Sequence, residues 1–441
     1  MKSKVSFYII FHLLVTELQS QQLLIPETFQ IQGIVKSEID GLGIPYVHVY
    51  VAGSAIGTVT NSEGEYEVKI PYSSSPIKVC VSGVGFQKEI FEVQRQLNQE
   101  MNFLLKEAVY ELNAVVITGN SVDSASLIYN TAVHFIRFNY PSKSHLIEGF
   151  FREVSLKDTA YTRLIEASIR VQEVGYQRNY FSNEGETKNR VKILELRKSD
   201  DFKHYDVVDK LFVSAMGEQN ELYTIFQKNY VRTISEEIEN RILTRRHIAL
   251  LDKNYEGHTI FDGEKVFVIS MQTPPASNFF RHEYVRFFIN AADYAIVKIE
   301  HLSVPNPSRN EIKPEWLIEN KFFSKSEILY RKIGGHYFPT FIHKTESPYD
   351  AKAIFKTGKK IEKQYIDVVF LLTNIFDERS LKIKWKEAED QEKDLYKINK
   401  PYNEQFWKNY NAVILNPLTK DRVKDLELKD SINAQFKKNN E

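Results

Sequence analysis

The chain is poor in cysteine, since Cys80 is the only one in 441 residues. A single thiol excludes a framework of internal disulfides. Cys80 alternates with Val79 and Val81 in a segment of strand-like periodicity, so we expect it to be a small buried side chain. The chain also lacks an excess of one charge, because Lys plus Arg and Asp plus Glu number 58 each. Without a concentrated basic face, a nucleic-acid partner is excluded.

Beyond residue 20, no apolar run is long enough to span a bilayer as a helix. Residues 1–20 have the pattern of a secretory signal peptide: Lys2 and Lys4 precede the apolar stretch 7–15, and the small Ser20 follows it. An uncleaved anchor is the alternative, although the stretch is short and contains His12. No cysteine follows to suggest a lipoprotein. We predict an exported protein of the periplasm, the outer membrane or the cell surface, free or attached to a membrane through a partner.

Signatures of common enzymes are also missing. There is no H-E-x-x-H motif, no G-x-S-x-G nucleophile elbow and no Walker-type phosphate loop. The glycine-bearing segment 53–57 joins two expected strands, so it lacks the helix N-terminus that holds phosphate. Asp200-Asp201 and Glu236-Glu237 lie in charged surroundings, which indicates solvated faces rather than a glycosidase pair. We predict that the chain is not an enzyme, with no catalytic residue and no cofactor.

Two H-x-x-E segments are the candidates for a zinc site: His145–Glu148 and His343–Glu346. A third ligand would come from His247, His258 or His282, and nothing in the sequence selects among them. With 11 histidines and many glutamates, about one such match is expected by accident. We therefore predict no metal site.

Strand-forming alternation is abundant, and aromatic residues reach 13 %. In the first quarter, valines at 47, 49 and 51 alternate with His48 and Tyr50, and apolar residues at 66, 68 and 70 alternate with charged ones. This period indicates half-buried strands with one face packed and one face in water. Between them, Asn61–Gly64 has the residues of a hairpin turn, whereas a calcium site over 61–65 would have too few carboxylates.

The turn and strand residues of this region also form a family pattern: Gly33, Pro45, Gly53, Gly57, Thr58, Thr60, Gly64, Tyr66, Pro71, Ser82, Gly85 and Phe86. With them, the region from 30 to 106 and the tail 112–119 resemble the carboxypeptidase-D-regulatory-like domain, a small transthyretin-like β-sandwich of envelope proteins. The chain departs from the family at Asn61, where the family usually has Asp. The resemblance implies a sandwich over residues 28–118 and implies no peptidase activity.

The remaining chain mixes one clear helix with many strands. Apolar spacing predicts a helix over 124–138, ended by Pro141, and a mostly helical segment over 203–247. The strands expected before residue 200 are 147–155, 161–174 and 191–197.

From residue 254 to 376, hairpins follow one another through turns such as Asp262-Gly263 and Gly334-Gly335, which predicts a curved antiparallel sheet. Its expected strands are 258–260, 265–270, 282–289, 295–302, 317–331, 337–346 and 363–376. Such a sheet would wrap around a helix or enclose an apolar hollow. The hairpin order, and phrases such as 262–269 and 335–339, resemble the half-barrel of lipoprotein-carrier proteins, whose curved sheet holds acyl chains.

Three phenylalanine pairs recur along these hairpins, at 279–280, 287–288 and 322–323. Neighbouring residues of a strand point to opposite faces. One ring of each pair is therefore expected in the core, whereas the other would line a groove or contact a lipid or a protein.

The sequence thus predicts a mainly β fold with some α: a transthyretin-like sandwich followed by a larger α+β domain with a curved, half-barrel-like antiparallel sheet. The predicted divisions are a signal peptide over 1–20, the sandwich over 28–118, the β-rich domain over 124–420 and an amphipathic tail over 421–441. The predicted function is that of a non-enzymatic cell-envelope binding or accessory protein with an envelope or outer-membrane protein as partner. The alternatives are a periplasmic carrier of lipid or another hydrophobic ligand and, less favoured, a zinc carboxypeptidase-like hydrolase.

Overall fold

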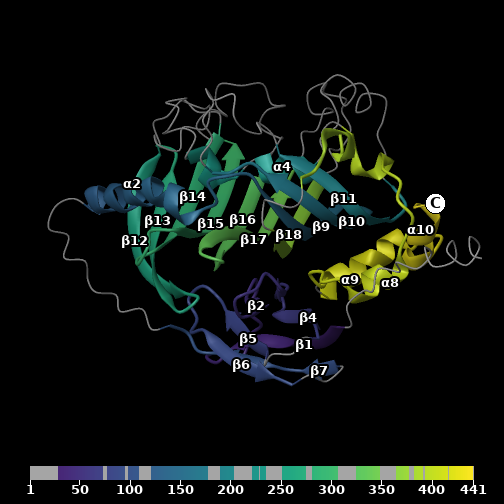
Figure 1. Ribbon diagram of the computed structural model, residues 1–441, viewed down its shortest axis with the longest axis horizontal. Helices are drawn as coiled ribbons and strands as arrows, with labels where there is room; N and C mark the ends of the chain where they lie inside the picture. Colours follow the sequence, from purple (N-terminus) through teal and green to yellow (C-terminus); the bar gives the residue numbers. More distant parts are fainter. Residues whose placement is uncertain are drawn as a thin grey trace, which may run out of the picture.

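The computed structural model describes residues 28–72, 77–94, 98–108, 121–176, 189–202, 221–227, 229–234, 251–274, 281–305, 324–347, 364–376, 382–390, 393–415 and 417–440. Their strands form two small sheets and one large sheet, accompanied by a few helices (Figure 1). The fold is mainly β, as the sequence predicts.

The two small sheets form the predicted sandwich. One has the order β4-β1-β7, with β8 also paired to β1, and the other has the order β3-β2-β5-β6. The bounds are β1 Thr28–Ser37, β2 His48–Val51, β3 Gly57–Val59, β4 Glu65–Pro71, β5 Ile77–Ser82, β6 Glu89–Val93, β7 Asn98–Glu100 and β8 Phe103–Leu105. Val49, Tyr66 and Val81 share the core between the sheets. The period of two along these strands therefore marks the face that packs inward.

The turn between β3 and β4 is built by Asn61, as predicted. Its Oδ1 accepts hydrogen bonds from the backbone N–H of Glu63 (3.0 Å) and of Glu65 (2.9 Å). Gly64 follows with a φ of 78°, which residues with a Cβ rarely adopt. The Asn61 amide also donates to the carboxylate of Glu65 at 2.9 Å. Asn61 and Glu65, which were considered for a calcium site, thus bond each other and the backbone of the turn.

The large sheet has ten antiparallel strands in the order β11-β10-β9-β18-β17-β16-β15-β14-β13-β12. Their bounds are β9 His145–Lys157, β10 Ala160–Glu173, β11 Arg190–Lys198, β12 Asp252–Phe261, β13 Glu264–Gln272, β14 Arg281–Asn290, β15 Ile296–Pro305, β16 Ser324–Ile333, β17 His336–Glu346 and β18 Gln364–Phe376. The predicted succession of hairpins is confirmed, and its last strand, β18, pairs with β9. Residues 317–323 of one expected strand lie outside the described residues.

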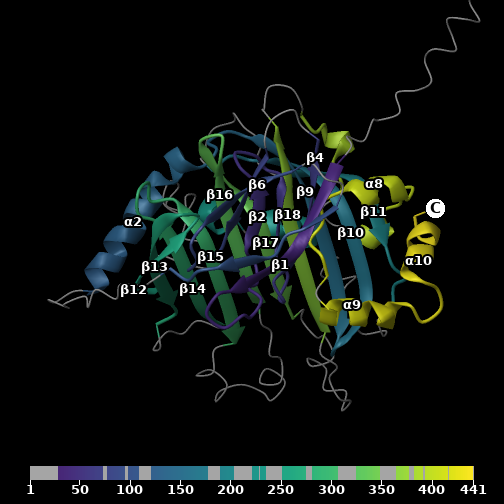
Figure 2. The same cartoon turned by 90° about the horizontal axis from the view of Figure 1, so that it is seen from below.

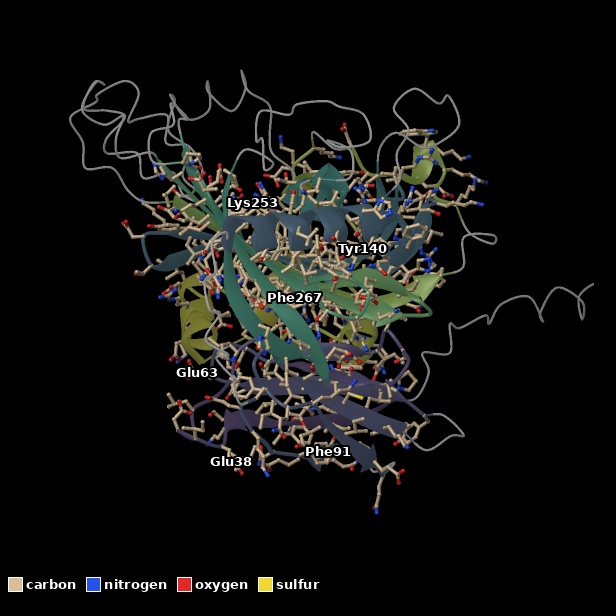
Figure 3. The ribbon with its side chains drawn as sticks, turned by 90° about the vertical axis from the view of Figure 1, so that its left-hand side faces the viewer. Glu38, Glu63, Phe91, Tyr140, Lys253 and Phe267 are labelled. Carbon is tan, nitrogen blue, oxygen red and sulfur yellow. The ribbon has the colours of Figure 1, made fainter. Side chains whose placement is uncertain are left out.

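Helices cover one face of the large sheet. Tyr129 of α2 (Ser121–Asn139) contacts Phe287, and Phe226 of α4 (Glu221–Gln227) contacts Phe370. Figure 3 shows α2 running across one side of the molecule, with Phe267 of β13 just below it. The helix predicted over 124–138 is confirmed. Of the stretch 203–247, the structure describes 221–227 and 229–234, and both are helical apart from residue 229.

The opposite face of the sheet carries the sandwich together with α8 and α10. The C-terminal elements are η3 Trp385–Glu387, η4 Leu395–Lys397, α8 Glu404–Asn409, α9 Pro417–Val423, η5 Lys424–Leu426 and α10 Ile432–Lys438. Leu426 and Phe436, both in the expected tail, are buried against Val154 and Leu164 of the sheet. No described helix has the length and apolarity needed to cross a bilayer.

Gly149 marks the tightest approach between β9 and β18. A Cβ at this position would lie 2.2 Å from the Phe370 ring and 2.6 Å from the Leu371 carbonyl oxygen. We expect Gly149→Ala to lower the free energy of unfolding by about 1–3 kcal/mol, because the packed ring has to move. Urea unfolding measures the change. The control Ser124→Ala, exposed on α2, should stay within about 0.5 kcal/mol of wild type, and an equally small effect at Gly149 would contradict the prediction.

Candidate functional site

Several polar side chains are buried where the sandwich meets the large sheet. Viewed from below in Figure 2, the strands of the sandwich lie over the large sheet. His48 and Tyr50 of β2 are only 3 % and 5 % exposed. The sequence predicted that the face of β2 with His48 and Tyr50 lies in water. This prediction is wrong, because the large sheet covers that face.

Tyr50 lies at the centre of this interface. Its hydroxyl donates a 2.6 Å hydrogen bond to Asp262, in the β12–β13 turn, and the guanidinium of Arg331 lies 3.7 Å from the centre of its ring. Lys88 of the sandwich forms an ion pair with the same Asp262 at 2.8 Å. Burial lowers the pKa of Arg331, whereas burial and the Asp262 carboxylate raise the pKa of Tyr50. The cation is thus held by an aromatic face and by a neighbouring carboxylate.

Cys80 faces the same interface. It is paired directly with Tyr50 across β2 and β5, so the two side chains project from the same face of the small sheet. Cys80 is 2 % exposed, which confirms that it is a small buried side chain. Its neighbours Val79 and Val81 belong to the core between the two small sheets, on the other face.

His48 is buried as a neutral imidazole. Its Nε2 lies 3.5 Å from the hydroxyl of Thr340, and its ring centre lies 6.0 Å from that of Phe261. Burial, assisted by the charges of Arg331 and Lys298, lowers the pKa of His48 to about 3. A proton taken up at this position would place a second cation beside Arg331 without a carboxylate to balance it.

A hydrogen-bonded chain of three side chains crosses the same interface. The hydroxyl of Tyr46 lies 3.1 Å from Nδ1 of His343, and Nε2 of His343 lies 2.7 Å from Asp367. With the proton on Nε2, Tyr46 donates to the imidazole and the imidazole donates to the carboxylate. Burial opposes the charge on His343, but Asp367 outweighs it and raises the pKa of His343. Tyr46 reaches this position with a φ of 57°, which is rare for a residue with a Cβ.

A C-terminal segment, residues 410–415, fastens the edge of β4. The side-chain amide of Asn411 accepts a 2.7 Å hydrogen bond from the N–H of Lys69 and donates one of 2.8 Å to its carbonyl. The Lys69 ammonium also donates to the carbonyl of Tyr410 at 3.2 Å. Arg152 of β9 donates to the carbonyl of Val413 at 2.7 Å, which ties the same segment to the large sheet. One side chain thus satisfies the pair of backbone groups that a neighbouring strand would have satisfied.

The two H-x-x-E segments lie on strands, not helices. Residues three apart on a strand point to opposite faces, so neither histidine can share a metal ion with its glutamate. His145 of β9 instead lies 3.4 Å from Glu173, and Glu148 accepts a 2.7 Å hydrogen bond from Arg170. His343 bonds Asp367, as described, whereas Glu346 pairs with Lys344 on the helix-bearing side of β17.

Two of the three candidate third ligands lie on other strands of the large sheet. His258 lies on β12 and His282 on β14, and His247 lies outside the described residues. Within the described ranges, no three His, Cys, Asp or Glu side chains come close enough to hold a metal ion.

The carboxylate pair Asp200-Asp201 also has structural partners. Asp200 accepts hydrogen bonds from Lys438 and Asn439 of the C-terminus, at 3.2 Å and 2.8 Å. Asp201 lies 3.6 Å from Arg163. The pair 236–237 lies outside the described residues.

The segment 53–57 is the loop from β2 to β3, as predicted, and it continues into a strand.

The helix-bearing face of the large sheet is filled by the protein's own side chains. Tyr140, Tyr176 and Tyr330 are among the largest fully buried residues, and the ring of Tyr140 contacts the other two rings. Beside them, Glu173 forms a 2.6 Å ion pair with Arg232, which is also buried. Burial opposes the charge of Glu173, but Arg232 and His145 outweigh it and lower its pKa. In the described part, this face is therefore packed and polar at its centre, where the sequence suggested an apolar hollow as one alternative.

The phenylalanine pair at 287–288 follows the predicted alternation. Phe287 faces Tyr129 of α2, whereas Phe288 lies on the other face beneath Arg286 and Lys298. Both rings are buried, so neither lines an open groove. The pairs 279–280 and 322–323 lie outside the described residues.

A polar hollow of about 380 Å³ lies between β11 and α8. It is lined by Leu194, Glu195, Lys400, Pro401, Tyr402, Asn403 and Glu404. Burial raises the pKa of Glu195, while Asn403 and Lys400 oppose the shift. Its lining combines both charges with Leu194, Pro401 and Tyr402, so it lacks the predominantly apolar character of a lipid pocket.

Comparison with known families identifies the N-terminal part. Residues 31–117 match the model of the CarboxypepD_reg-like domain. The resemblance drawn from the turn and strand residues is confirmed. A search of curated proteins finds no match to the chain.

Comparison with solved structures finds proteins similar to about three fifths of the chain. A domain assigned as an outer membrane lipoprotein-sorting protein from Vibrio parahaemolyticus is 9 % identical, with 60 % of this chain and 95 % of that one covered and a TM-score of 0.28. A LolA superfamily protein from Nitrosomonas europaea is 12 % identical, with 60 % and 97 % covered and a TM-score of 0.20. A DUF1329 family protein from Desulfovibrio piger is 8 % identical, with 60 % and 99 % covered and a TM-score of 0.26. Lipoprotein-carrier folds are thus among the similar structures, and scores of this size assign neither ligand nor activity.

His48 gives the docked interface a defined response to acid. Its pKa is about 3 in the folded protein against an ordinary value of 6.5, so the unfolded chain takes up the proton first as the pH falls. Between about pH 5.5 and pH 4.5, we expect wild type to lose about 1.3 kcal/mol of unfolding free energy per pH unit more than His48→Gln does. Urea unfolding at a series of pH values gives the two slopes.

His343 acts in the opposite direction, because its raised pKa adds stability below pH 6.5 that is lost as the pH rises through the folded value. It is present in both proteins, so its contribution cancels in the difference. Parallel curves for wild type and His48→Gln would contradict the buried neutral state of His48.

Asn411→Ala removes both hydrogen bonds to the backbone of Lys69. Each bond contributes about 1 kcal/mol, so we expect exchange of the Lys69 amide hydrogen to become about fivefold faster or more. Hydrogen exchange followed by NMR measures this single amide. Asn409→Ala is the matched control, since that side chain bonds only the carbonyl of Gln405 within α8. Equal exchange at Lys69 in the two variants would show that Asn411 does not hold the β4 edge.

Proposed function

We propose that this chain is a non-enzymatic binding protein of the cell envelope, in which the large sheet carries the sandwich as a docking module. The N-terminal family match supports a module of this type, and the signal-peptide pattern of residues 1–20 supports export. We propose the same domain division as the sequence indicates, with a sandwich over 28–118 and a larger domain from 124. Several of the side chains considered for chemistry serve in ion pairs and hydrogen bonds of the structure, which favours binding over catalysis; among them are His145, His343, Asp200 and Asp201.

The observation that carries this proposal is the different state of the sandwich edges. At the β3 edge, Val59 packs into the core of the large sheet, and at the β4 edge Asn411 bonds the backbone of Lys69. β6 is the last strand of its sheet. Just before it, Phe86 is bridged to Glu107, whereas no described strand pairs with the outer side of residues 89–93. Figures 1 and 3 place β6, with Phe91, on the side of the sandwich away from the large sheet. An open edge of this kind accepts an added strand from a partner.

The side chains of β6 fit this use. Ile90 is 57 % exposed, and Glu92 beside it is exposed as well. Phe91, by contrast, points inward and lies 4.7 Å from Phe103 between ring centres. The strand is therefore anchored by one ring and presents an apolar residue and a charge to the outside. This favours an extended protein segment with an apolar side chain as the partner.

The two alternative functions have less support from the geometry. A lipid carrier needs an apolar hollow, and the described part of the helix-bearing face is filled by tyrosines and by the Glu173–Arg232 ion pair. A zinc hydrolase needs convergent ligands, and His145–Glu148 and His343–Glu346 diverge across their strands.

Site-specific crosslinking in intact cells tests the β6 edge. We expect a photo-crosslinking residue in place of Glu92 to form a discrete adduct with one envelope protein, because that residue lies on the open strand. The same residue in place of Leu428, which is 72 % exposed far from β6, is the control and should form none. Adding Ile90→Lys should reduce the adduct at least tenfold, because a lysine on an edge strand discourages pairing. Equal adducts from positions 92 and 428, or no effect of Ile90→Lys, would overturn the proposal.

A further inference from the structure

Trp385 is the unexpected aromatic residue of this protein. Trp407 is 6 % exposed and packs over Phe150, whereas Trp385 is 62 % exposed. Tryptophan is usually largely buried, because its ring is the largest apolar side-chain surface. Trp385 lies in the stretch that follows β18, drawn in yellow-green at the upper right of Figure 1, beside β11 and away from the sandwich.

The exposed ring is held in place rather than left to move. The Arg190 guanidinium lies 4.0 Å from the centre of the indole, and its Nη1 donates a 2.6 Å hydrogen bond to the carbonyl of Ile383. Ile383 is 2 % exposed, and its N–H donates to Gln172 of β10 at 3.0 Å. The backbone before Trp385 is thus pinned to the sheet, and the ring stacks on a cation supplied by β11.

Three lysines surround this ring in sequence and all are exposed: Lys382, Lys384 and Lys386. Within the described ranges, none of the three has a carboxylate within ion-pair distance. Three exposed lysines therefore flank an exposed indole within five residues of chain. We call residues 382–386 the tryptophan–lysine turn.

Three acidic residues follow the lysines along the chain: Glu387, Glu389 and Asp390. Glu387 turns back to accept a hydrogen bond from the backbone N–H of Lys384 at 3.3 Å. Glu389 and Asp390 lie close enough to Tyr223, near α4, that they add to burial in raising the pKa of Tyr223 to about 12. Glu389 and Asp390 thus lie toward Tyr223, whereas Glu387 stays within the turn at the backbone of Lys384.

We propose that the tryptophan–lysine turn binds the surface of a bilayer that contains anionic phospholipids. Indole rings partition to the boundary between headgroups and acyl chains, where one side of the ring is apolar and its N–H stays hydrated. Lysines beside it are attracted to anionic headgroups, and the attraction falls with salt. Apart from Ile383, every side chain of the turn is exposed, so it offers a partner peptide no groove, whereas a lipid surface needs none. This inference is independent of the proposed docking edge at β6.

Vesicle co-sedimentation with the full mature chain tests the proposal. We expect binding at least tenfold tighter to vesicles of phosphatidylglycerol and phosphatidylcholine than to phosphatidylcholine alone, and weakening in high salt. Trp385→Ala, and separately the triple change Lys382→Ala, Lys384→Ala and Lys386→Ala, should each reduce this binding at least tenfold. Emission of the wild-type protein should shift to shorter wavelength on binding, and this shift should be absent in Trp385→Ala.

The matched control removes three lysines elsewhere: Lys408→Ala, Lys424→Ala and Lys437→Ala, whose side chains are 64 %, 75 % and 60 % exposed. It changes the net charge equally and should bind vesicles within twofold of wild type. Near-ultraviolet circular dichroism, which reports the buried Trp407, confirms that each variant is folded. Equal losses in the two triple variants would assign the binding to net charge and overturn the proposal. Binding to soluble polyphosphate without binding to vesicles would overturn it as well, in favour of a polyanion site.

Discussion

The arrangement of this protein depends on a buried cation between two domains. Arg331 is 6 % exposed, and its charge is accommodated by the ring of Tyr50 and by Asp262. A buried charge that loses its partners is costly, so these contacts fix the angle at which the sandwich meets the large sheet. That angle decides which sandwich edges are covered and turns β6 outward. β6 belongs to the same small sheet as Tyr50, and Lys88, just before β6, pairs with Asp262, so these contacts also position the proposed binding edge.

Much of the fold could be predicted, because its signals are local. Period-two alternation marked the strands, Asn61 and Asp262-Gly263 marked turns, and the apolar spacing of residues 124–138 marked α2. Each of these signals is contained in a few neighbouring residues, and the structure places each where the sequence suggested. The sandwich family could likewise be identified, since its glycines stand at positions where the backbone itself needs them.

The interface could not be predicted, because its partners are far apart along the chain. Tyr50 and Asp262 are separated by 212 positions, and Asn411 and Lys69 by 342. The alternation on β2 indicated that one face is apolar, but the expectation of water on the polar face was wrong, because another domain covers it. The H-x-x-E segments misled for a different reason. Residues three apart share one face only on a helix, where they could bind one metal ion, and both segments fold as strands.

The position of Cys80 has a practical consequence. The only sulfhydryl of the molecule lies under the sandwich, opposite Tyr50, where an alkylating reagent reaches it only after the two domains part. The rate at which a dilute reagent alkylates Cys80 therefore measures how often the two domains separate. No engineered probe is needed, because no other thiol competes. Conditions that weaken the interface without unfolding either domain would speed the alkylation of Cys80 and leave the far-ultraviolet circular dichroism spectrum unchanged.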